Sequence, residues 1–134
     1  MTPQPDLAAF LAARLDEDEA IAKAALPGPW MTGKAASHLA DEVVYGQSRD
    51  WPDHIVQVCN VEYGHNKDAD AAHITRHDPA RVLREVAFKR AILAECVRAL
   101  ESIPHGHRAV LAERVLRHLA AVDGGHSGYR QEWA

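Results

Sequence analysis

Two histidines spaced four residues apart, with an aspartate ahead of them, are the side chains of this sequence best suited to bind a metal. Asp70, His73 and His77 follow the spacing i, i+3, i+7, so a helix would bring them to one face. Imidazole and carboxylate are common zinc ligands, and His65 or His105 could supply another. The alternative is that His73 packs as a hydrogen-bonded core histidine, while His77 closes the helix, where a cation meets the helix dipole favourably.

Three arginines surround the dipeptide Asp78-Pro79, at Arg76, Arg81 and Arg84. The N-terminus of a helix presents free N–H groups, so this corner is a candidate site for an anion or a phosphate. No glycine-rich phosphate-binding loop accompanies the arginines. Solvated arginines on an exposed helix are the simpler interpretation.

Charged side chains also fall on two otherwise apolar helical stripes. Arg14 and Asp18 lie on one face of a helix predicted over 6–26, and Arg90 lies on the apolar stripe of a long helix predicted over 79–101. An unpaired buried ion costs several kcal/mol, so we expect Asp18 to pair with Arg90 and Arg14 to share the carboxylate. Two alternatives stay open: the side chains reach solvent at an edge, or they line a polar pocket.

The Asp78-Pro79 corner divides the helices that carry these residues. Proline disfavours the helical conformation for the residue before it and is well suited to the first helical position, with Asp78 as the cap. The sequence therefore predicts a short helix over 69–77 and a long helix over 79–101.

The remaining segments complete an α+β fold, in which three main helices and one short helix pack on a small antiparallel β-meander. Period-2 alternation and turn residues predict the meander, and Tyr129 and Trp133 are expected to pack back on the body. We expect a single domain over 1–134, with these additional segments: helix 6–26, meander 30–62, helix 107–122 and aromatic tail 127–134.

Composition narrows the classes of protein. Hydrophobic residues make up 47% of the 134 residues and charged residues 25%, which is ordinary for a globular protein. The net charge of −4 disfavours binding to nucleic acid, and no apolar run is long enough to span a membrane. Cys59 and Cys96 form no CxxC motif, so we expect reduced thiols and a cytoplasmic location.

Four segments carry a resemblance to a known family: HITRHDPARVLREV, RLDEDEAIA, PGPW and GYRQEW. In these the chain resembles the small actinobacterial and actinophage proteins of the family named domain of unknown function 6221. The resemblance implies an actinobacterial or phage origin and no established activity. Members often carry a cysteine-bearing insert similar to a zinc knuckle before the last helix, but here 103–108 contains no cysteine.

Two classes of function follow from the residues. The first, which we favour, is a non-enzymatic protein-interaction or regulatory accessory protein without a cofactor, which binds a protein partner or associates with itself. Phe88 and Ile92, with Cys96 beside them, form a second apolar strip on the long helix that needs a partner. The second is a small metal- or anion-dependent enzyme or binding protein centred on Asp70, His73 and His77, with zinc as the metal.

Overall fold

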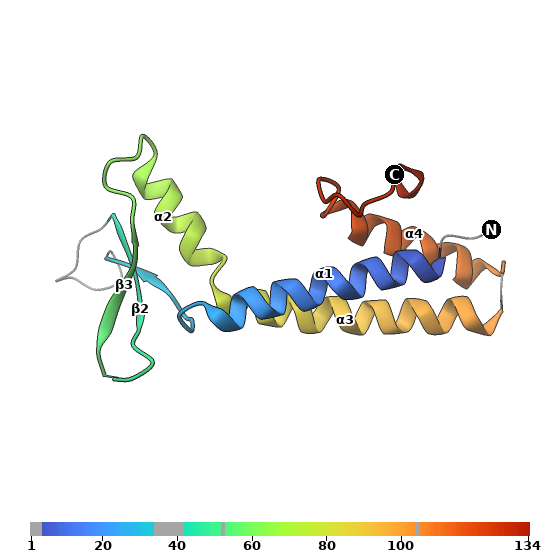
Figure 1. Ribbon diagram of the computed structural model, residues 1–134, viewed down its shortest axis with the longest axis horizontal. Coiled ribbons are helices and arrows are strands. Elements are labelled where there is room, and N and C mark those ends of the chain that lie inside the picture. Colours follow the sequence, from blue (N-terminus) through green and yellow to red (C-terminus); the bar gives the residue numbers. More distant parts are fainter. Residues whose placement is uncertain (1–3, 34–41, 52, 104) are drawn as a thin grey trace. The chain divides into compact units, whose positions relative to one another are not determined.

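The computed structural model describes residues 4–33, 42–51, 53–103 and 105–134 (Figure 1). Within these residues, four α-helices and a three-stranded antiparallel sheet form an α+β fold, which confirms the predicted fold class. The chain divides into two compact units, described separately below. Unit 1 contains the described residues up to Asp18 together with Val86–Ala134, and unit 2 is Glu19–Glu85. The expectation of a single domain stays a prediction.

The helices and strands lie close to the expected ranges, and their ends differ by a few residues. The first helix begins at Gln4, so Asp6 lies in its first turn and accepts a hydrogen bond from Arg130 Nη1 at 2.9 Å instead of capping the helix. In chain order the elements are α1 (Gln4–Ala24), β1 (Met31–Thr32), β2 (Val43–Gln47), β3 (Ile55–Asn60), α2 (Lys67–Arg76), α3 (Pro79–Ser102), α4 (His107–Ala121) and the 3₁₀ turn η2 (Gln131–Trp133).

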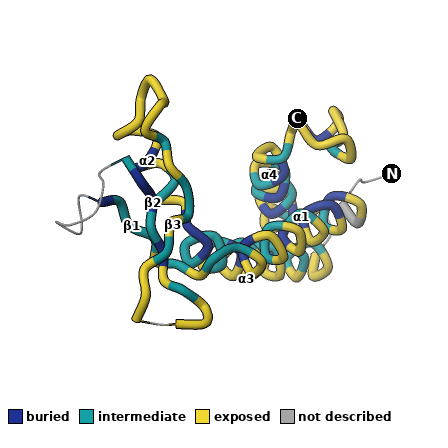
Figure 2. The backbone as a smooth tube through the Cα atoms, turned by 60° about the vertical axis from the view of Figure 1, so that its left-hand side comes forward, coloured by how far each residue is buried: buried dark blue, intermediate teal, exposed yellow. Residues whose placement is uncertain are grey.

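Unit 2 is built around the meander β1-β2-β3. Val44 in the central strand pairs with Thr32 on one side and with Cys59 on the other, and its side chain is fully buried. Helix α2 packs against β1 and β2 through its buried Ala71. The segment from Glu62 to the start of α2 is exposed, as Figure 2 shows in yellow.

The corner before α3 forms as the sequence predicted. Asp78 is the helix cap: its Oδ1 accepts the backbone N–H of Arg81 at 2.9 Å, three residues on. Its other oxygen, Oδ2, accepts the backbone N–H of Trp30, also at 2.9 Å. Asp78 is only 6% exposed, so both of these hydrogen bonds are shielded from water.

Unit 1 has a core formed by α1, α3, α4 and the C-terminal segment. Phe10 in α1 lies under the tail, with its ring centroid 5.1 Å from that of Trp133 and 6.1 Å from that of Tyr129. Trp133 is 2% exposed, which confirms that the aromatic tail packs on the body. The buried core residues are Leu7, Phe10, Leu11, Cys96, Ala112, Leu116, Ala120 and Trp133.

Helix α4 turns back along α3 (Figure 1), and alanines make up most of its buried face. Its buried residues are Leu116 and the alanines Ala109, Ala112 and Ala120. Alanine allows a close approach of neighbouring helices, so α4 packs through these alanines as well as through Leu116. Three apolar residues of the predicted helix 107–122 are exposed: Val110 (51%), Leu111 (60%) and Val122 (73%).

Candidate functional site

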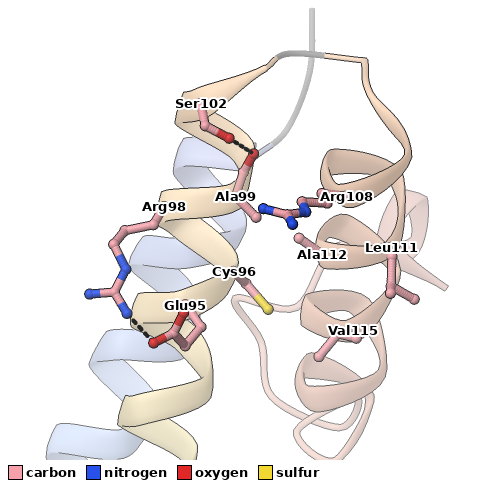
Figure 3. A pocket seen from close by; sticks show the side chains of 9 residues that line it. All are labelled: Glu95, Cys96, Arg98, Ala99, Ser102, Arg108, Leu111, Ala112 and Val115. Atoms are coloured by element: carbon pink, nitrogen blue, oxygen red, sulfur yellow. Dashed lines mark hydrogen bonds and ion pairs between the residues drawn. The ribbon is translucent and has the colours of Figure 1, made fainter.

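An open groove runs between α3 and α4 in unit 1, with a volume of about 480 Å³ (Figure 3). We call it the α3–α4 groove. Helix α3 contributes Cys96 and Ala99 to its apolar lining, and α4 contributes Leu111, Ala112 and Val115. Its polar lining residues are Glu95, Arg98, Ser102 and Arg108.

The polar side chains of the groove differ in whether they already have an ion-pair or hydrogen-bond partner. Glu95 and Arg98 form an ion pair with each other, and Ser102 Oγ donates to the Ala99 carbonyl at 3.1 Å. Arg108 reaches from α4 toward Ala99 on α3, as Figure 3 shows, and has no ion-pair partner within the described part of the chain. One cation therefore stands unpaired at the edge of an apolar groove.

The cysteine of the groove is a neutral apolar group and not a reactive thiolate. Cys96 is 8% exposed, and burial raises the pKa of its thiol, with the charge of Glu95 adding to the shift. A raised pKa leaves the protonated thiol at neutral pH, and only the thiolate is a nucleophile. Cys96 therefore contributes packing surface to the groove, which agrees with the expectation of a free thiol.

The polar cluster expected from Arg14, Asp18 and Arg90 is only partly correct. Arg90 is exposed and donates to Asp16 Oδ1 at 2.8 Å, so the expected pair between Asp18 and Arg90 is wrong in its partner. The cause is the face of α3: Lys89 and Leu93 turn toward α1 and α4, and Arg90 lies one residue further round the helix. The sequence had placed Arg90 in the middle of the buried stripe.

Asp18 lies instead in a small cavity among α1, α3 and α4, with Arg14, Lys89 and Asp123. We call these four residues the Asp18 cluster. Leucines line the remaining wall of the cavity, and the cavity volume is about 10 Å³. Burial raises the pKa of the Asp18 carboxyl, and the charge of Asp123 raises it further. Lys89 and Arg14 act in the opposite direction without reversing the shift. Sequence reasoning missed Lys89 and Asp123, because only the tertiary fold brings them to Asp18.

Arg14 joins the Asp18 cluster to the C-terminal segment. Its Nη2 donates to Glu17 Oε1 at 2.7 Å, and its Nη1 donates to the ring of His126, 2.7 Å from Nδ1. The guanidinium also stacks over the Phe10 ring at 5.1 Å from the centroid. These contacts are structural, since they fix the start of the tail that carries Trp133 into the core.

The four candidate metal ligands are all exposed residues of unit 2: His65, Asp70, His73 and His77. The rings of His73 and His77 stack with centroids 4.4 Å apart, and His77 Nδ1–H donates to the His73 carbonyl at 2.9 Å. No group of three or more His, Cys, Asp or Glu side chains is placed to hold a metal ion in the described part of the chain. His73 is therefore not the core histidine of the simpler interpretation, whereas His77 does close α2.

The candidate anion site at the corner contains an anion of the protein itself. Asp78 occupies the N-terminus of α3 and accepts the N–H of Arg81. The Arg81 side chain is also engaged, since Nε donates to Glu85 Oε1 at 2.8 Å. Arg76 and Arg84 are exposed. The backbone donor that would attract an external anion is thus already used.

The candidate interface on α3 separates into two parts. Phe88 is 63% exposed, as expected for an apolar residue at an interface with a partner. Ile92 is half-buried and packs against the core of unit 1 together with Cys96. The second apolar strip is therefore covered by the core of unit 1 at Ile92 and Cys96, and it is open at Phe88.

These observations define a small α+β protein with an apolar groove between two helices. The chain belongs to the Family of unknown function (DUF6221), whose family model matches residues 4–134. No curated protein and no solved structure matches the chain. Among the described residues, no helix has the length and apolar character needed to cross a membrane.

Proposed function

We propose that the protein is a non-enzymatic interaction protein that binds a protein partner through the α3–α4 groove. The observation that carries this proposal is Leu111, a leucine 60% exposed beside an open groove with an apolar floor. Removing apolar surface from water contributes roughly 25 cal/mol per Å². A contiguous exposed apolar surface with a polar edge is typical of a protein-binding site.

Helical spacing extends this surface beyond the groove. On α3, Phe88 precedes Ile92 by four residues and Ala99 by eleven, so all three follow one stripe. Leu111 on α4 and Val122, the C-cap of that helix with helical backbone angles, are also eleven residues apart and share a face, and both are exposed. A partner that fills the groove can therefore extend along both helices and cover Phe88 and Val122.

A selection from a displayed library of helical peptides tests this proposal, with Leu111→Asp as the diagnostic variant. The matched control is Ile21→Asp, because Ile21 is an exposed apolar residue (70%) on a helix and does not line the groove. We expect binders that lose affinity for Leu111→Asp and keep it for Ile21→Asp. Failure to select any binder, or binders indifferent to Leu111→Asp, would contradict the proposal. Size exclusion of the unliganded protein reports whether a second copy occupies the surface instead.

A further inference from the structure

We infer that the partner segment is an amphipathic helix whose apolar stripe is flanked by acidic side chains. This inference rests on the proposed function and names the class of partner. The walls of the groove are two helices, and its volume of about 480 Å³ lies within the range of roughly 300–1,000 Å³ typical of ligand pockets. A third helix can lay apolar side chains into such a groove, with anchors at helical spacing.

The charges beside the groove determine which sign of charge the partner must carry. Arg108 and Arg114 lie three residues before and three residues after Leu111, so they stand on either side of it on the surface of α4. Both are exposed, and neither has an ion-pair partner within the described residues. Each cation would pair with a carboxylate that accompanies an apolar side chain docked against Leu111.

The other charges of this surface are already neutralised. Arg117 pairs with Glu113 Oε1 at 2.9 Å, and Arg98 pairs with Glu95. Helix α4 carries three arginines and one glutamate, a formal charge of +3 − 1 = +2, in a chain whose net charge is −4. The groove therefore borders a basic surface on an acidic protein, which favours an acidic partner.

A second copy of the chain supplies this chemistry poorly. Its acidic run lies on α1, where Asp16 pairs with Arg90, Glu17 with Arg14 and Glu19 with Lys23. Using these carboxylates at an interface would require breaking an ion pair for each. The ion pairs of α1 thus favour a different protein, with acidic side chains of its own, as the partner.

Two synthetic amphipathic helices test the inference: they share one leucine stripe and carry either glutamate or lysine on both flanks. Fluorescence anisotropy measures their binding to the full chain at low and high salt. We expect the glutamate peptide to bind about tenfold more tightly at low salt, with a smaller difference at high salt. Arg108→Glu should remove or reverse the preference, whereas Arg84→Glu, an exposed arginine outside the groove, should preserve it.

The outcomes distinguish this inference from the proposed function. Arg108→Glu places an acidic residue in the first turn of α4, where it suits the helix dipole, and circular dichroism verifies that the variant folds. If both peptides bound equally and Leu111→Asp abolished their binding, the inference of an acidic partner would be overturned. The proposal of an interaction groove would then still hold. Equal competition by single-stranded DNA would also overturn it, because a polyanion without an apolar stripe would then suffice. Binding of neither peptide would overturn the inference, and the library selection would decide on the groove itself.

Discussion

The Asp78 carboxylate joins the backbone of Trp30 to the start of α3, with Oδ2 2.9 Å from the Trp30 nitrogen and Oδ1 2.9 Å from the Arg81 nitrogen. The two segments that meet there are PGPW and DPAR, both parts of the family resemblance seen in the sequence. One buried carboxylate thus caps a helix and holds the chain between α1 and β1 against it. This contact accounts physically for both motifs without a catalytic role.

Replacing Asp78 with asparagine should destabilise the protein. The amide keeps one acceptor oxygen, but its NH₂ group would face a backbone N–H and leave a buried donor unpaired. We expect a loss of about 1–3 kcal/mol in the free energy of unfolding, measured by urea denaturation. The exposed Asp50→Asn serves as the control and should change little. Equal midpoints for the two variants would contradict the role assigned to Asp78.

Gly28 should tolerate no side chain, because Asp78 occupies the space beside it. A Cβ at position 28 would lie 2.7 Å from Asp78 Oδ2 and 2.9 Å from Ala80 Cβ. Gly28→Ala should therefore cost about 1–3 kcal/mol through overpacking. Gly125→Ala is the matched control, since nothing lies within 4 Å of the added Cβ. A thermal melt in which both variants match the parent would show that the contact with Asp78 is looser than described.

Asp18→Asn should stabilise the protein at neutral pH. The folded-state pKa of Asp18 is raised above its ordinary value of 3.8, by burial first and by Asp123 second. The folded state therefore holds the proton more tightly than the unfolded state, and the stability contributed by Asp18 falls as pH rises from 3.8 through the raised pKa. Thermal melts from pH 4 to 7 should show an advantage of Asp18→Asn that grows with pH. An advantage that shrinks toward neutral pH would contradict the direction of the shift.

Phe88→Glu and Ile92→Glu should have different effects on stability, because Phe88 lies on the surface of α3 and Ile92 packs against the core. Phe88 is mostly exposed, so its replacement should shift the free energy of unfolding by no more than about 0.5 kcal/mol while weakening any self-association. Ile92 packs against the core, and a buried charge there should cost more than about 2 kcal/mol. Size exclusion beside a thermal melt measures both effects. A melting temperature lowered equally by the two variants would place Phe88 in the core.

The sequence could predict the features that depend on neighbouring residues. Asp-Pro identified the cap at Asp78, and alternation with turn residues identified the meander, because both signals are local. The buried face of α4 could not be predicted in this way. Apolar periodicity favours the larger side chains such as Leu111, whereas the fold buries Ala112 and Ala120 because close packing of helices selects small residues.

The candidate site depends on the same distinction. Apolar periodicity favours Leu111 as a buried residue of the last helix, so the α3–α4 groove had no signal in the sequence. Asp18 was correctly singled out as a charged residue on an apolar stripe, but its neighbour Lys89 comes from α3 and Asp123 comes from the turn after α4. A rotation of about 100° per residue was enough to direct the prediction to Arg90 instead of Lys89.

The most direct test of the interaction groove is an amide ¹H–¹⁵N titration of the full chain with the glutamate-flanked peptide. We expect the largest shift changes at Cys96, Ala99, Ala112 and Val115, which line the groove on its two helices. Leu111→Asp should abolish these changes, and Ile21→Asp should leave them intact. Saturable changes confined to unit 2, or none at these four amides, would contradict the account.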